Sequence, residues 1–232
     1  MIPMFDFKGY GHFLVEGTVM TITVAIVSMA GAIVLGLVGA GAKLSRNRIA
    51  RELGRGYTTI IRGVPDLVLL LLMFYGGTVL VQWLACVFGH PGTVDINAFI
   101  TGTVVLSFIY GAYATEAFRG AFLGVPKGQM EAAKACGMSR WLAFRRIELP
   151  QVWRFALPGL GNVWLVLLKG TAIISVVNLE ELTRKAQLMN GPLKMPFSIY
   201  FAAALIYLGL TAVSETVLRE AERRSRLGER TA

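Results

Sequence analysis

Five apolar stretches constrain most strongly what this 232-residue chain can fold into. Each reaches the roughly 20 residues that an α-helix needs to cross the hydrocarbon core of a bilayer. Within that core the backbone polar groups must be satisfied inside the segment, which favours helices. The sequence therefore predicts an all-α, polytopic membrane protein, with residues 1–232 forming a single transmembrane domain. The spans are expected at residues 13–42, 65–88, 98–123, 155–177 and 197–218.

The composition agrees with a membrane protein. Hydrophobic residues make up 55% of the chain and charged residues only 16%, whereas about a quarter of the residues in a soluble domain are charged. The first residues lack the basic start and small-residue cleavage site of a secretory signal peptide. The net charge of +9 could suggest nucleic acid, but basic residues gather in the cytoplasmic loops of membrane proteins. We therefore expect contact with membrane lipid and none with nucleic acid.

The basic residues are divided unevenly between the connectors. Most of the 23 Lys and Arg residues lie in residues 41–63, in residues 124–154 and in the C-terminal tail. The positive-inside rule places these segments in the cytoplasm, so five spans put the N-terminus outside and the C-terminus inside. Residues 178–196 read as an irregular stretch. Their three basic residues fit an exterior position poorly, so a re-entrant or interfacial segment is an alternative there.

The sequence carries no recognisable catalytic or metal-binding motif. It lacks G-x-x-x-x-G-K-[ST], H-E-x-x-H and G-x-S-x-G. His12 and His90 are isolated at span ends, and Cys86 and Cys136 fall on opposite faces of the predicted topology. We therefore expect no enzyme, no metal site and no disulfide.

The cytoplasmic loop at residues 124–153 has a distinctive spacing. Its fixed positions are Glu131, Ala132, Ala133, Gly137, Ile147, Leu149 and Pro150. The small alanines would let a short helix enter a cleft in another protein. Gly137 permits a sharp bend because it has no Cβ, and Pro150 suits the first turn of a helix. The pattern predicts a short helix, a bend, a second short helix and then the fourth span.

Polar groups within the spans are costly in a bilayer, which makes them candidates for a substrate path. These candidates are Glu16, Glu116, Arg119, Lys169, Thr171, Ser175 and Asn178. Glu116 and Arg119 lie one turn apart, so a structural ion pair is the alternative. Glu16 could instead be an interfacial acid in contact with water. The hydroxyls and the amide that follow Lys169 could equally hydrogen-bond across packed helices.

The spacing of residues 131–150 resembles the EAA motif of ABC importer permeases. Other segments are similar to the polar amino acid branch of that family, and especially to the Q-type permeases of histidine/lysine/arginine/ornithine importers and related opine permeases. The similar segments are residues 57–76, 111–113, 116–120, 125–129, 168–172, 181–182 and 186–187. One departure is Gly170, where many amino acid permeases carry Asp.

The resemblance implies the five-helix, MetI-like permease fold of type I ABC importers, in a bacterial inner membrane. Such a permease pairs with a second permease, similar or identical, and with two ATP-binding subunits that hold ATP and Mg²⁺. A periplasmic substrate-binding protein delivers an amino acid, here a basic one or an opine. The chain itself would need no cofactor. A stand-alone channel or secondary carrier, a membrane-bound enzyme, and a permease for another polar amino acid are the alternatives.

The resemblance also implies roles within the cytoplasmic loop. Glu131, Ala132, Ala133 and Gly137 would form the surface that couples to the ATPase, and Ile147, Leu149 and Pro150 would fix its join to the fourth span. The neighbouring Arg145 and Arg146 would either pair with acidic residues of the ATPase or serve only as inside charges.

Overall fold

The computed structural model describes residues 7, 9–88 and 97–226, and every regular element in these residues is helical. His90 and the rest of residues 89–96 lie outside the described part of the chain. In chain order the elements are α1 (Gly11–Leu44), α2 (Arg48–Gly63), α3 (Asp66–Val87), α4 (Ala98–Gly124), α5 (Lys127–Ala135), α6 (Arg140–Ala143), the π-helix η1 (Phe144–Glu148), α7 (Leu149–Gly170), the 3₁₀-helix η2 (Thr171–Val177), α8 (Leu182–Leu193) and α9 (Pro196–Arg226). Five helical runs are long and apolar enough to cross a membrane. The predicted class, all-α with five spans, is confirmed.

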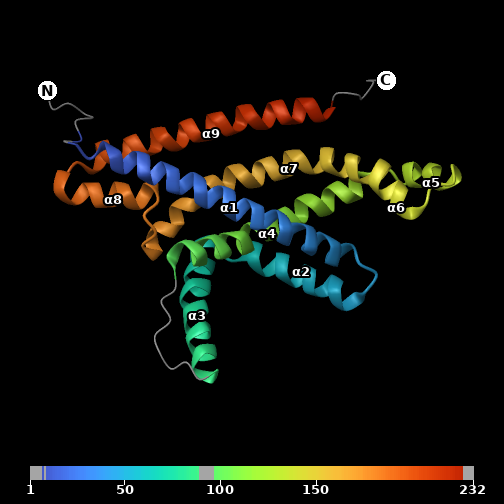
Figure 1. The fold of residues 1–232 in the computed structure, drawn as a ribbon, viewed down its shortest axis with the longest axis horizontal. Helices are drawn as coiled ribbons and strands as arrows, with labels where there is room; N and C mark the ends of the chain where they lie inside the picture. Colours follow the sequence, from blue (N-terminus) through green and yellow to red (C-terminus); the bar gives the residue numbers. More distant parts are fainter. Residues whose placement is uncertain (1–6, 8, 89–96, 227–232) are drawn as a thin grey trace.

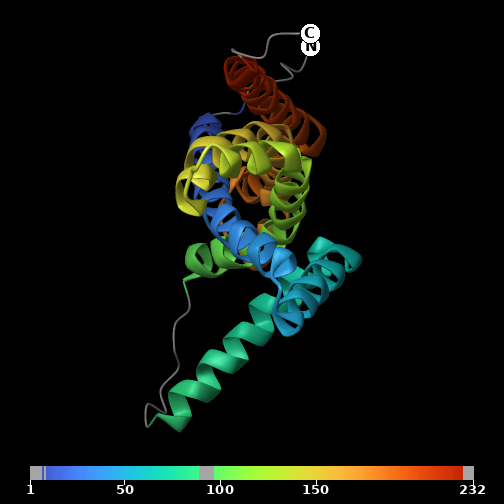
Figure 2. The ribbon, with the colours of Figure 1, turned by 90° about the vertical axis from the view of Figure 1, so that its right-hand side faces the viewer.

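Small residues form the contact between α1 and α4, which lie side by side through the centre of the molecule (Figure 1, Figure 2). The facing pairs are Gly31 with Ser107, Gly36 with Ala114, and Gly39 with Thr115. A Cβ on Gly36 would lie only 2.6 Å from that of Ala114. Close approach of this kind is how helices associate in lipid, where apolar burial gives no driving force. Since the residue numbers of the pairs rise together, α1 and α4 run parallel.

Helix α7 packs against α4 in the opposite direction. Gly159 of α7 faces Ala117, and Gly170 faces Tyr110. The three helices α1, α4 and α7 therefore enclose most of the buried side chains, with α9 along one edge (Figure 2).

Helix α3 projects away from this bundle as a separate arm in both views (Figure 1, Figure 2). Its only buried residues are Leu69 and Leu70, near its start. Most of its apolar surface is therefore available to lipid or to another protein.

The basic stretch after the first span, predicted as a connector between spans, forms the helix α2. Asn47 caps α2 by accepting a hydrogen bond from the Ile49 N–H at 2.9 Å. The face of α2 that carries Gly54, Thr58 and Ile61 is buried against α1 and α4. Tyr57 donates a 2.6 Å hydrogen bond to the carbonyl of Phe108. Helix α2 thus turns back along the bundle and ends beside the middle of α4.

The predicted irregular stretch at residues 178–196 also contains a helix. Residues 189–192, which belong to that predicted irregular stretch, lie inside α8. Leu182, Ala186 and Met189 of α8 are fully buried against α1 and α9. The left-handed residue Asn178 (φ 63°) ends η2 and turns the chain toward α8. Gly17 of α1 allows α8 to pack this closely, because a Cβ at residue 17 would lie 2.7 Å from the Leu182 Cα.

Candidate functional site

The segment α5–α6 lies at the far end of the molecule, beyond the ends of α4 and α7 (Figure 1). Gly137 lies at the bend between the two helices with φ +76°. The Met138 N–H donates to the Ala133 carbonyl at 3.1 Å and the Gly137 N–H to Lys134 at 2.9 Å, which closes the end of α5. A residue with a Cβ would be strained at this φ.

Helix α6 continues without a break into the fourth span, which corrects the expectation of a separate second short helix. The π-helical turn η1 joins α6 to α7, and the whole run from Arg140 to Val177 is helical. Pro150 lies in the first turn of α7, where it cannot donate a backbone hydrogen bond. The Gln151 side chain donates to the Ile147 carbonyl at 2.9 Å, within the same turn. A displacement of α6 is therefore transmitted directly to α7.

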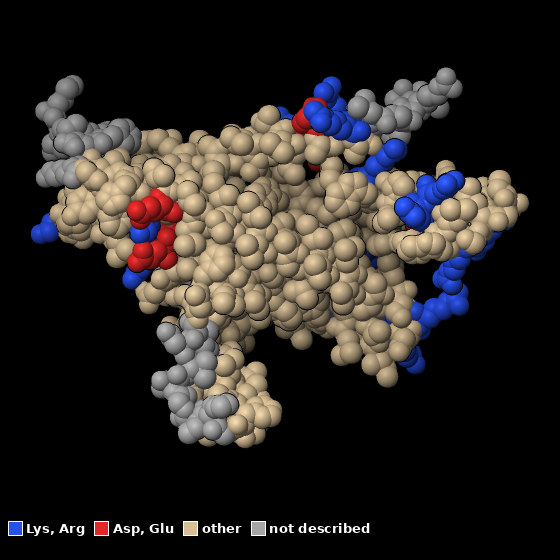
Figure 3. Space-filling view, in the orientation of Figure 1, with Lys and Arg blue, Asp and Glu red and all other residues tan. Residues whose placement is uncertain are grey.

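The surface of this segment combines apolar and basic groups. A groove of about 460 Å³ is lined by Met130, Arg140, Trp141, Phe144 and Glu148. Trp141 is 69% exposed and stacks on Phe144 with ring centroids 5.7 Å apart. Basic side chains gather at this end of the molecule (Figure 3). The arrangement suits contact with another protein, because the aromatic groups extend beyond the ends of the neighbouring spans.

Among the seven fixed positions of the segment, Glu131 and Ala132 are exposed, while Ala133 is buried. Leu149 and Pro150 are exposed and Ile147 is half-buried. The structure thus brings the seven positions to one end of the molecule, on α5, the bend, η1 and the start of α7.

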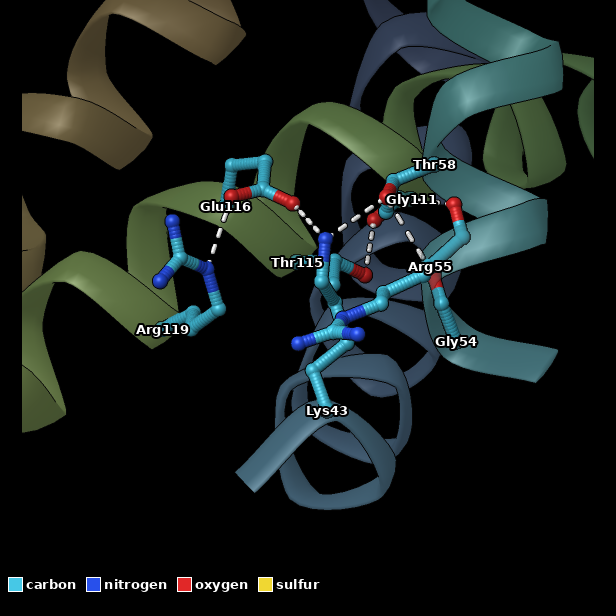
Figure 4. A network of polar contacts seen from close by, with 8 residues as sticks. All are labelled: Lys43, Gly54, Arg55, Thr58, Gly111, Thr115, Glu116 and Arg119. Atoms are coloured by element: carbon cyan, nitrogen blue, oxygen red, sulfur yellow. Dashed lines mark hydrogen bonds and ion pairs between the residues drawn. The ribbon is translucent and has the colours of Figure 1, made fainter. Parts of the chain in front are cut away.

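Glu116 is the centre of an ion-pair network at the end of α1 (Figure 4). Arg119 donates to one of its carboxylate oxygens at 2.9 Å, and the Lys43 ammonium binds the other. Lys43 also donates to the Thr58 hydroxyl at 2.8 Å. The network therefore joins α1, α2 and α4, which supports the structural ion-pair alternative for Glu116.

Glu16 lies at the opposite end of α1 from this network. Lys185 of α8 reaches both Glu16, at 2.9 Å, and Glu180, at 2.8 Å. Hydrogen bonds to Glu180 and Glu16 raise the pKa of Lys185. Both carboxylates are more than half exposed, and an acidic patch is visible at this end of the molecule (Figure 3). The structure does not bring Glu16 and Glu116 together.

The four remaining path candidates follow one another through the end of α7 and η2. Lys169 is exposed and forms no ion pair with any described residue. The buried Thr171 hydroxyl donates to its own helix, at the Leu168 carbonyl, over 2.8 Å. Ser175 is buried and Asn178 is exposed. These side chains do not meet Glu116.

Two acidic side chains with hydrogen-bond partners in the structure are not among the residues predicted from the sequence. The Asp66 carboxylate accepts a 3.3 Å hydrogen bond from the Tyr110 hydroxyl, although it lies in the first turn of the apolar helix α3. The fully buried Glu181 caps α8, accepting from the Thr183 and Arg184 N–H groups at 2.8 Å and from the Tyr207 hydroxyl at 3.0 Å. Burial raises the pKa of the Glu181 carboxyl. An acid directly after Pro65 at a span boundary was the available signal for Asp66.

Within residues 7, 9–88 and 97–226, no three His, Cys, Asp or Glu side chains are grouped as metal ligands would be. Cys86 and Cys136 are both free and exposed.

The fold and the projecting basic segment define a polytopic membrane subunit with a surface for another protein. Residues 32–227 match the family described as "Binding-protein-dependent transport system inner membrane component", and the chain belongs to this family of ABC transport permeases. It is a transport subunit and not an enzyme, because the ATPase of these systems is a separate subunit. Its partners accordingly include an ATP-binding subunit and a substrate-binding protein.

Named relatives match nearly the whole chain. The histidine/lysine/arginine/ornithine permease HisQ of Escherichia coli K12 is 46% identical over 224 residues, covering 97% of this chain and 98% of the relative. The nopaline permease NocQ of Agrobacterium fabrum C58 is 46% identical over 223 residues, covering 96% and 94%.

Solved structures share the fold. A chain of an amino acid ABC transporter crystallised with histidines superposes with a TM-score of 0.82 at 31% identity, covering 97% of this chain and 99% of that one. A chain of the inward-facing methionine transporter MetNI superposes with a TM-score of 0.75 at 18% identity, covering 93% and 97%. The second likeness concerns the fold alone.

Proposed function

We propose that this permease imports basic amino acids, namely histidine, lysine, arginine or ornithine, or a related opine, by alternating access. The observation that carries the substrate class is 46% identity over nearly the full length to permeases named for those substrates. The assembly would comprise this chain, a second and similar permease, two ATP-binding subunits and a periplasmic binding protein. ATP and Mg²⁺ would bind to the ATP-binding subunits.

The segment α5–α6 is the proposed surface for the ATP-binding subunit. The exposed face of α5 with Glu131 and Ala132 would enter a cleft of the partner, and the groove beside Trp141 would receive a side chain from it. The surrounding basic side chains would face acidic groups at the rim of that cleft. Because α6, η1 and α7 form one helix, movement of the ATPase would tilt α7. Alternating access needs a mechanical link of this kind between the motor and the spans.

The proposed orientation puts this segment in the cytoplasm of a bacterial inner membrane, with the N-terminus in the periplasm and the C-terminus in the cytoplasm. Two observations support it. Basic side chains gather at the α5–α6 end and an acidic patch lies at the other (Figure 3), as the positive-inside rule requires. The parallel direction of α1 and α4 agrees with their being the first and third of five spans.

The first test measures ATP-driven arginine uptake in proteoliposomes that contain the complete importer. Gly137→Asp should lower uptake by more than about tenfold, because a side chain at φ +76° distorts the bend that positions α6. The amount of protein in the membrane should be unchanged. Gly191→Asp is the control, since Gly191 lies on α8, away from the α5–α6 segment, in open space with an ordinary φ.

Normal uptake by the Gly137→Asp importer would contradict the coupling role. Uptake by this chain alone, without ATP, would favour the channel or carrier alternative instead.

A further inference from the structure

The chain reverses its direction between α1 and α2 within a few residues (Figure 1). Helix α1 ends at Leu44 and α2 begins at Arg48. We call residues 44–55, which include this turn and the first two turns of α2, the α1–α2 corner. Its basic residues are Arg46, Arg48, Arg51 and Arg55. Glu52 is the one acidic residue among them, so the corner carries a net positive charge.

Two arginines of the α1–α2 corner have no acidic partner. Glu52 is shared by Arg55, at 2.8 Å, and Arg51, at 3.9 Å. Arg46 and Arg48 are exposed, and the side chain of neither forms an ion pair or a hydrogen bond with any described residue. Two positive charges at this turn are therefore available to an anion.

Beyond these arginines, α2 exposes an apolar stripe. Ile49, Leu53 and Ile60 recur at helical spacing and are 71%, 69% and 62% exposed. They lie on a different face of α2 from the buried Gly54 and Thr58, which pack against the bundle. The outer surface of α2 thus begins with unpaired positive charge and continues with apolar side chains.

The α1–α2 corner lies at the level of one membrane surface. Lys43 of α1 binds Glu116 of α4 just before the corner, whereas Glu16 near the other end of α1 binds Lys185. The part of α1 between these two ion pairs is about 40 Å long at 1.5 Å per residue. A bilayer with its headgroups is about 40–45 Å thick. With one ion pair near each surface, the corner falls among the lipid headgroups.

Helix α7 supports this level. Gly159 of α7 faces Ala117, which is next to Glu116 on α4. Arg154 precedes Gly159 on the antiparallel α7, so it lies toward the end of the bundle that carries the corner. Basic groups from separate helices thus meet at one level, as they do at a membrane surface.

A phospholipid with a net negative charge matches both parts of this surface. Its headgroup lies at the level of the unpaired arginines, and its acyl chains extend into the hydrocarbon in the same direction as α2. Basic groups beside an apolar helical face are typical of protein surfaces that bind anionic lipids. An acidic soluble protein would reach the arginines only from the water and would leave the apolar stripe uncovered.

We propose that the α1–α2 corner binds an anionic phospholipid, such as phosphatidylglycerol, from the adjoining leaflet. The guanidinium groups of Arg46 and Arg48 bind the headgroup phosphate, which the planar fork of arginine suits. One acyl chain lies along Ile49 and Leu53. The bound lipid covers the turn beside Lys43, and it does so whichever substrate the importer carries.

The test is site-specific photocrosslinking in the complete importer. Benzoylphenylalanine takes the place of Ile49, which follows Arg48 and is exposed. The importer is placed in phosphatidylcholine vesicles with a trace of radiolabelled phosphatidylglycerol or, in a parallel sample, of radiolabelled phosphatidylcholine. After irradiation, this chain should carry about fivefold more label from phosphatidylglycerol, since each basic residue near a lipid surface contributes about that factor to the binding of negative charge.

Removing both charges with Arg46→Gln and Arg48→Gln together should lower this preference to about twofold or less. The matched control is Arg223→Gln with Arg224→Gln. It removes the same charge from another exposed helix end, but both of its arginines pair with Glu220, at 2.8 and 2.7 Å. The control should keep the preference of the unsubstituted importer.

Equal labelling by the two lipids, or an unchanged preference after loss of Arg46 and Arg48, would overturn the inference. So would a crosslink to another subunit in place of lipid, or a preference abolished by excess inorganic phosphate. If the double glutamine variant assembles poorly, Arg46→Lys with Arg48→Lys decides: it keeps the charge and should retain most of the preference, and its loss would contradict the site. Labelling needs an assembled importer but no transport, so its failure is distinct from a failure of the proposed function.

Discussion

At the scale of single residues, the structure separates charges that hold helices together from charges that are free to act. Glu116 binds cations from α1 and α4 and is joined through Lys43 to Thr58 of α2. Lys185 likewise ties α8 to Glu16 of α1. Asp66 and Arg62 have no such ionic partners in the described residues. Charge type alone does not distinguish these groups, whereas their partners do.

Replacing Glu116 by Gln tests its structural role. The substitution leaves Lys43 and Arg119 close together without the carboxylate, so the purified permease should lose about 2 kcal/mol of stability, less than for a fully buried pair because Arg119 is partly exposed. Thermal unfolding of the detergent-solubilised permease, followed by the loss of helical circular dichroism, measures the change in stability. Glu215→Gln is the control, since Glu215 forms an exposed pair with Arg219 at 3.0 Å. Equal stability of the two variants would argue against the network.

At the scale of helices, close contact between α1 and α4 sets the geometry on which the other elements depend. The contact uses glycine on α1 and small residues on α4. Helices α2, α7 and α8 then pack against this pair. A change in the spacing of α1 and α4 should therefore affect the whole bundle.

Gly36→Ala should destabilise this contact. Its Cβ would lie 2.6 Å from the Ala114 Cβ and 3.0 Å from the Ala114 carbonyl carbon, and relieving the overlap costs about 1–3 kcal/mol. Gly41→Ala provides the comparison, because that position of α1 faces open space. The yield of monodisperse permease in detergent should drop for Gly36→Ala and not for Gly41→Ala; unchanged yields in both would show that the two helices can separate without cost.

The long helices could be predicted from the sequence because length and hydropathy alone decide whether a segment can cross a bilayer. Helices α2 and α8 were missed since both are short and charged, and tertiary packing buries one face of each. The pairing of Glu116 with Arg119 follows from their spacing on one helix. Lys43 and Asp66 could not be assigned in this way, because their partners lie 73 and 44 residues away along the chain.

At the scale of the whole molecule, the face drawn in Figure 3 carries its charged side chains mainly at two ends, with an uncharged surface between them. The α5–α6 end is basic and carries the exposed Cys136. The other end carries the exposed Glu180, beside Lys185. The proposed orientation can therefore be read out by chemical labelling.

In intact spheroplasts, a membrane-impermeant maleimide should label a Glu180→Cys variant that lacks both native cysteines. Cys136, in a Cys86→Ser variant, should react only after the membrane is permeabilised. Labelling is quantified by a mass shift on a gel. Reaction of Cys136 from outside would invert the orientation and would place the proposed ATPase surface on the wrong face.

The projection of α3 has a consequence for the order in which the permease is built. The backbone hydrogen bonds of a helix are satisfied internally, so α3 is stable in lipid without help from the bundle. With only Leu69 and Leu70 buried, the chain itself supplies little that fixes the direction of this arm. We therefore expect the angle of this arm to be set by the protein or lipid that comes to lie beside it, after α3 itself has entered the membrane.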